Sequence, residues 1–188
     1  MAAKATHEQA PPPPTRLDPI AGALSYLIPG LGQIIQGRVA KGLLFFVCIY
    51  TLFFYGMALG KWKNVYLPES KKNGDLSPFL DLYNRPHFAG QFFIGMGVWP
   101  AVWQYLHYDA SKDEGPLFGK YMRAPTGEEI NNLQREENKN WDLAWVYTVI
   151  AGVLNILVIY DAVAGPAFRD MLRKDTEPPQ NPTAPAKQ

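Results

Sequence analysis

Four apolar segments separated by polar stretches dominate the pattern along this chain: residues 20–35, 42–60, 88–108 and 143–168. A helix needs about 20 apolar residues to cross the hydrocarbon core of a bilayer. The last three segments approach or exceed that length, and the first is shorter. The pattern predicts an all-α membrane protein with about four membrane-embedded helices.

The first segment differs from the others because Pro29, Gly30 and Gly32 interrupt it. Non-helical backbone at membrane depth must find hydrogen-bond partners in protein or water. We therefore expect this segment to pack against a neighbouring helix, and it either spans the membrane or re-enters on the same side.

The third segment carries Pro100 near its middle and several glycines before it, which predicts a kink in the glycine-rich half. The fourth segment begins beside Trp141 and Trp145, a composition typical of the membrane interface. Pro166 and Arg169 are expected to mark its end.

The connections and tails complete the expected organisation. Ser77 and Pro78 resemble a helix start, and Thr126 with Glu129 forms a capping-box pattern, so both connections are predicted to hold short interfacial helices. Residues 1–17 and 171–188 are rich in proline and are predicted to be disordered tails around a single helical domain, 18–170.

Lys and Arg positions predict the orientation. With four full spans, eleven of these residues lie on the side of both termini and seven on the other, which favours cytoplasmic termini in a bacterial inner membrane. If the first segment is re-entrant, the count becomes nine on each side and predicts nothing. The net charge of +1 gives no reason to expect a nucleic-acid partner.

The most specific stretch is a glycine-rich turn between the first two segments. Small residues allow close approach of helices in lipid, and a glutamine can satisfy backbone groups that a proline leaves free. We predict a structural turn built from Pro29, Gly30, Gly32, Gln33, Gly37 and Gly42. Arg38 and Lys41 are expected to reach the lipid headgroups.

This turn also carries a resemblance. The Pro-Gly-x-Gly-Gln…Gly-Arg…Gly stretch is similar to the two-helix hairpin module of small bacterial membrane proteins. Together with residues 80–86, residues 141–143 and the stretch from Asn155 to Asp161, the chain resembles an uncharacterised family of planctomycete-type bacterial membrane proteins. The resemblance covers roughly residues 18–168 and implies a multi-span membrane protein of unknown function.

Three polar residues in or near the apolar segments are candidate sites: Asn155, Asp161 and His107. Polar groups in membrane helices face the protein interior and mark either function or an interhelical hydrogen bond. We favour a structural bond for Asn155 and Asp161, and a place in the interfacial aromatic belt for His107. The single cysteine, Cys48, is expected to behave as a small apolar residue.

No hydrolase or dinucleotide-binding motif occurs, and the sequence predicts no cofactor or metal. The favoured interpretation is a non-enzymatic interaction or assembly subunit, whose partners are the lipid bilayer and another membrane protein or a second copy of itself. A small transporter or channel protomer is the first alternative, because the helices are broken and contain polar residues. A membrane enzyme acting on lipid or envelope material is the second.

Overall fold

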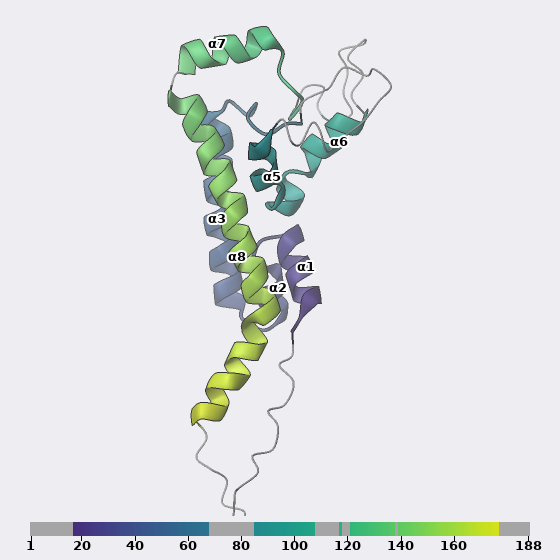
Figure 1. Ribbon diagram of the computed structural model, residues 1–188, viewed down its shortest axis with the longest axis vertical. Coiled ribbons are helices and arrows are strands. Elements are labelled where there is room, and N and C mark those ends of the chain that lie inside the picture. Colours follow the sequence, from purple (N-terminus) through teal and green to yellow (C-terminus); the bar gives the residue numbers. More distant parts are fainter. Residues whose placement is uncertain (1–16, 68–84, 108–116, 118–120, 138, 177–188) are drawn as a thin grey trace, which may run out of the picture.

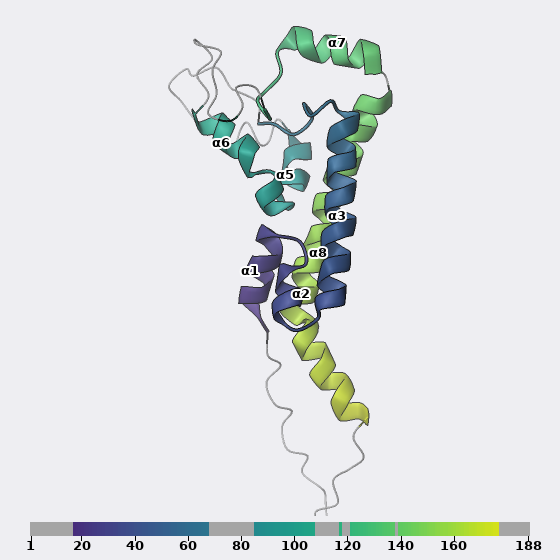
Figure 2. The ribbon, with the colours of Figure 1, turned by 180° about the vertical axis from the view of Figure 1, so that it is seen from behind.

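The computed structural model describes residues 17–67, 85–107, 117, 121–137 and 139–176. In this part of the chain the structure has seven α-helices, one short 3-10 helix and no strand. Two long helices, α3 (Val39–Leu59) and α8 (Lys139–Thr176), lie side by side (Figures 1 and 2). Helices α1, α2 and α5 are arranged along them, α7 lies across one end, and α6 extends away from them.

Helices α3 and α8 run antiparallel. Gly56 near the end of α3 packs against Thr148 near the start of α8, whereas Arg38, just before α3, lies against Gly165 near the other end of α8. A Cβ atom at Gly56 would lie 3.1 Å from the carbonyl oxygen of Ala144, so glycine permits this close approach. Both helices contain a stretch apolar and long enough to cross a membrane, and among the described residues they are the two that do.

The first apolar segment forms a hairpin of two short helices, α1 (Pro19–Leu27) and α2 (Leu31–Ile35). Asp18 begins α1, since its Oδ1 accepts a hydrogen bond of 3.0 Å from the amide of Ala21. The chain then turns at Gly30, whose φ of +86° favours glycine. A side chain at Gly30 would collide with the backbone of Gly42 at the start of α3.

The third apolar segment is not one kinked helix, and that prediction was wrong. It divides into α5 (Pro86–Phe92), the 3-10 helix η1 (Gly95–Gly97) and α6 (Trp99–His107), which together are called the second hairpin. Gly95 has a φ of +71° and breaks the helix completely. Pro100 is the second residue of α6, where a missing amide hydrogen costs little, so it begins a helix instead of bending one.

The capping box is confirmed. The amide of Thr126 donates to Glu129 Oε2 at 2.9 Å, and the amide of Glu129 donates to Thr126 Oγ1 at 3.3 Å, at the start of α7 (Gly127–Glu137). The apolar part of the fourth segment ends at Ala167, as Pro166 and Arg169 predicted, but the helix does not end there: α8 continues through Pro166 to Thr176, beyond residue 170. The helix start at residues 77–78 and the tails 1–16 and 177–188 lie outside the described residues.

In the described part of the chain, an apolar core lies between α3, α8, residues 65–67, residues 88–101 and Met122. Its most buried large members are Phe53, Met57, Val65, Ile94, Val98 and Met122. The opposite faces of the long helices stay exposed and apolar, with Leu43, Leu44, Val47, Tyr55, Val146, Ile150, Val153 and Leu157 among their residues.

We predict that two turn glycines differ in what they tolerate. A methyl group at Gly32 would collide with the carbonyl of Ala21, so Gly32→Ala should cost about 1–3 kcal/mol of stability. At Gly37 a Cβ meets nothing within 4 Å, and only its φ of +77° favours glycine. Gly37→Asn should therefore melt in detergent close to the wild type, because asparagine tolerates this backbone conformation. Equal melting temperatures for Gly32→Ala and the wild type would contradict the close approach.

Candidate functional site

Helices α1 and α5 approach each other along α8 from its two ends. The amide of Asp18, before α1, donates to the carbonyl of Val163 at 3.0 Å. His87, in the first turn of α5, places its ring 5.5 Å from that of Trp145. Because Val163 and Trp145 lie toward opposite ends of α8, the two short helices end near the same height on it (Figure 1).

Asn155 joins the ends of these two helices. Its buried Nδ2 donates to the carbonyl of Ser25 in α1 at 3.2 Å and to that of Phe93, which ends α5, at 2.7 Å. The helical partner of the Ser25 carbonyl would be the amide of residue 29, but Pro29 has no N–H. One side chain of α8 thus satisfies carbonyls from both hairpins.

Hydrogen bonds of Ser25 and Gln33 join the two helices of the first hairpin. Ser25 Oγ accepts from the amide of Gly32 and donates to Gln33 Oε1, both at 3.1 Å. Gln33 Nε2 donates in turn to the carbonyl of Val158 at 2.8 Å and to Asp161 Oδ2 at 3.2 Å. Both polar side chains are fully buried, so these bonds replace the water that the site excludes.

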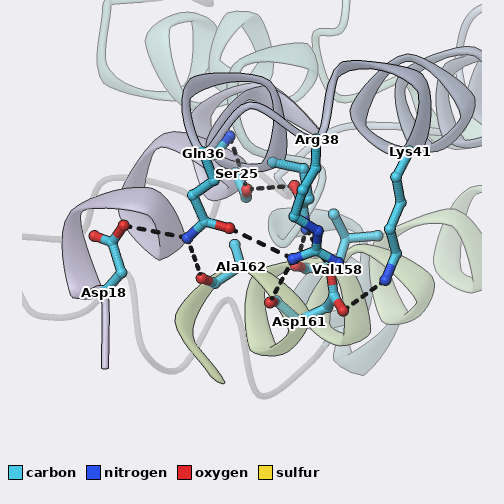
Figure 3. A network of polar contacts seen from close by, with 10 residues as sticks. Asp18, Ser25, Gln36, Arg38, Lys41, Val158, Asp161 and Ala162 are labelled. Carbon is cyan, nitrogen blue, oxygen red and sulfur yellow. Dashed lines mark hydrogen bonds and ion pairs between the residues drawn. The ribbon is translucent and has the colours of Figure 1, made fainter. Parts of the chain in front are cut away.

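Asp161 carries two cationic partners. Arg38 Nη2 lies 2.6 Å from its Oδ2, and Lys41 Nζ lies 2.7 Å from its Oδ1 (Figure 3). We predicted from the sequence that these two basic residues reach the lipid headgroups; in the structure both side chains pair with Asp161 and so join the start of α3 to α8. The side chains of Arg38 and Asp161 are 15% and 27% exposed, so the pair is screened less than a surface ion pair.

Gln36 ties the same region to the beginning of α1. Its Nε2 donates to the carbonyl of Ala162 at 2.7 Å and to Asp18 Oδ2 at 3.1 Å. The hydrogen bonds from Ala21 and then from Gln36 favour the ionised form and lower the pKa of Asp18 below its ordinary value.

A second buried polar group lies closer to the start of α8. Thr148 Oγ1 accepts from Gln91 Nε2 at 2.7 Å, and Asn64 Nδ2 donates to the carbonyl of Ala144 at 3.0 Å and to Thr148 Oγ1 at 3.5 Å. These side chains join α5 and the chain just after α3 to α8. Among the described residues, four side-chain oxygens are buried without a hydrogen-bond partner: those of Asn64, Gln91 and Asn155 in the contacts above and that of Gln104 in α6.

The structure brings together most of the predicted site residues but not His107. Pro29, Gly30, Gly32, Gln33 and Gly42 meet at the first hairpin, near Asp161. His107 ends α6, where its ring stacks on that of Trp103 with centroids 4.2 Å apart. No group of three or more His, Cys, Asp or Glu side chains that could hold a metal occurs in the described part of the chain.

Sequence reasoning missed the partners of these residues. Ser25, Asn64 and Gln91 are buried hydrogen-bonding residues that it did not single out. A polar side chain within an apolar segment was the available signal for Ser25 and Gln91, whereas Asn64 lies in a polar connection and gave none. The observed bonds consist of amide, hydroxyl and ion-pair contacts between helices, and they contain no arrangement of nucleophile and general base.

Comparison with known proteins assigns the chain to a family but gives no activity. No curated protein and no solved structure matches it. A family described as of unknown function, DUF6677, matches residues 20–175, which is most of the chain. The protein belongs to this family of unknown function.

Proposed function

We propose that this protein is an integral membrane protein in which α3 and α8 cross the bilayer and two hairpins enter it from opposite sides. The sequence predicted about four membrane-embedded helices. In the proposed arrangement two of the four apolar segments, residues 20–35 and 88–108, enter and return instead of crossing. Support comes from the apolar faces that α3 and α8 leave exposed and from the bonds that satisfy each broken backbone.

This arrangement puts both termini on the same side of the bilayer, because the amide of Asp18, just before α1, donates to the carbonyl of Val163 in the second half of α8. The arrangement also changes the count of Lys and Arg residues from which the orientation in the membrane was predicted. With α3 and α8 as the two spans, eight Lys and Arg residues lie on the side of the termini and ten on the other. The charge difference that favoured cytoplasmic termini is therefore no longer present.

Reporter fusions test the topology. We expect a fluorescent protein and alkaline phosphatase to report the same side from either terminus, and the opposite side when inserted after Glu137. The insertion follows α7, which leaves both long helices intact. Termini on opposite sides would require an odd number of spans and would overturn the proposal.

Within the membrane, the role we propose is that of a non-enzymatic interaction or assembly subunit. One observation carries this proposal: the polar residues between the helices bond to one another, while the outward faces of α3 and α8 are apolar and free for lipid or another protein. Asp161, for example, is bound by Arg38, Lys41 and Gln33. Because these polar groups are used to hold the helices together, the apolar outward faces of α3 and α8 are the surfaces left for contact with another membrane protein.

Purification in mild detergent tests this role. We expect the tagged full-length protein to retain a different membrane protein at constant stoichiometry. Two variants and one control make the test specific to the exposed faces. Val47→Trp and Val153→Trp enlarge outward side chains, whereas the control Cys48→Ser changes an exposed residue with little change in size. Loss of the partner with the tryptophan variants alone supports a helix-face interface, and a protein purified without any partner contradicts the proposal.

A small transporter is the second candidate, and the paired half-helices favour it. In several transporters the ends of broken helices lie at the centre of the membrane and bind the transported ion or substrate. Here α1 and α5 end at Asn155, where a buried amide oxygen has no partner among the described residues. A homo-oligomer in the purification, with no other protein, would favour this candidate.

A further inference from the structure

A pocket of about 370 Å³ lies where α5, α7 and the first turns of α8 meet. It is separate from the Asn155 and Asp161 contacts, and the favoured assembly role makes no use of it. Its lining includes Tyr66, Arg85, His87, Trp141, Asp142 and Trp145.

Arg85 is the residue that distinguishes this pocket. Its guanidinium carbon lies 3.5 Å from the ring centroid of Tyr66 and 4.4 Å from that of Trp145. One hydrogen bond, of 3.3 Å, runs from Nη1 to the carbonyl of Tyr66. A guanidinium has five N–H donors in its plane, and aromatic rings cover its faces but not its edges. Donors therefore remain for a further partner.

The charge of Arg85 is not neutralised by a carboxylate in the described part of the chain. The ion pairs there join Asp161 to Arg38 and Lys41, and Glu129 to Lys63 and Arg123. Burial lowers the pKa of Arg85, but from an ordinary value so far above neutrality that the side chain stays cationic. A partly buried cation of this kind gains from an anion that reaches its free donors.

The position of the pocket indicates which anions can reach it. Trp141 and Trp145 lie at the start of the apolar part of α8, and tryptophans at such positions sit at the level of lipid headgroups. Asp142 borders the same pocket and adds a carboxylate. A cation and a carboxylate in one interfacial pocket match a zwitterionic headgroup, whose phosphate and ammonium carry opposite charges.

We propose that this pocket binds the headgroup of a phospholipid, with the phosphate on Arg85 and an ammonium group toward Asp142. The proposal rests on the membrane location proposed above, but it is independent of the assembly role. The shared chemistry is a phosphoryl group on a guanidinium, and a soluble phosphate compound could also supply it.

The test uses full-length protein in a maltoside detergent, which contains no phosphate. Dihexanoyl-phosphatidylethanolamine and inorganic phosphate are titrated separately, and the melting temperature is followed by circular dichroism. We expect a saturable rise with the phospholipid and a much weaker one with phosphate. Arg85→Gln should weaken the apparent affinity for the lipid by about tenfold or more, as for loss of a charge-assisted hydrogen bond. Arg135→Gln, an exposed arginine of α7, is the control that removes the same charge elsewhere.

The outcomes distinguish a phospholipid from a soluble phosphate as the ligand, and each contrary result overturns a different part of the proposal. An equal response to inorganic phosphate assigns the site to soluble phosphates and overturns the lipid. An unchanged lipid affinity in Arg85→Gln, or no saturable rise in the wild type, overturns the site itself. If Arg85→Gln does not fold, Arg85→Lys replaces it: it keeps the charge but loses the planar donors, and wild-type affinity in that variant would overturn the guanidinium contact. Because the isolated protein is used, failure here is distinct from failure to find an assembly partner.

Discussion

The carbonyl of Ser25 has no donor within its own helix, because the residue four positions later is a proline. In water such a group would be hydrated, but inside a membrane it needs a partner from the protein. Asn155 of α8 supplies that partner and, with the same amide nitrogen, also binds the carbonyl of Phe93. In the proposed membrane arrangement the two hairpins depend on this contact, because each ends at mid-height on α8 with a broken backbone that lipid could not satisfy.

The other polar contacts extend the same arrangement in both directions along α8. Toward one end, Gln33, Gln36 and Asp161 bind the first hairpin and the start of α3. Toward the other, Thr148 binds Gln91 and Asn64. Interhelical hydrogen bonds in membranes contribute only about 0.6–2 kcal/mol each. A row of them along one helix nevertheless fixes the register of every neighbour, because each donor has a particular carbonyl or oxygen to reach.

The long helices and the glycine-rich turn could be predicted from the sequence. The division of the third apolar segment at Gly95 and the contacts of the broken segments with α8 could not. The apolar run at residues 42–60 and the capping box at Thr126 are local signals, and the structure has the helices they predict. Residues 88–108 have the length and composition of a span, yet Gly95 turns the chain back, and a φ of +71° leaves no periodic trace in the sequence. The partners of Asp161 are more than 100 residues away in the chain, and no spacing rule connects them.

The account depends most on the claim that α1 and α5 end against each other, and a cross-linking measurement tests it directly. The rings of Tyr26 and Phe92 lie 5.7 Å apart across this junction. With Cys48 replaced by alanine, Tyr26→Cys and Phe92→Cys should be joined by a short bifunctional thiol reagent in native membranes, as identified in the digested protein by mass spectrometry. The account predicts efficient intramolecular cross-linking for this pair and none for Tyr26→Cys with Trp145→Cys. Trp145, in α8, lies beside the start of α5, at the end away from this junction. Absence of the Tyr26–Phe92 cross-link, while each cysteine alone still reacts with the reagent, would contradict the meeting of the two hairpins.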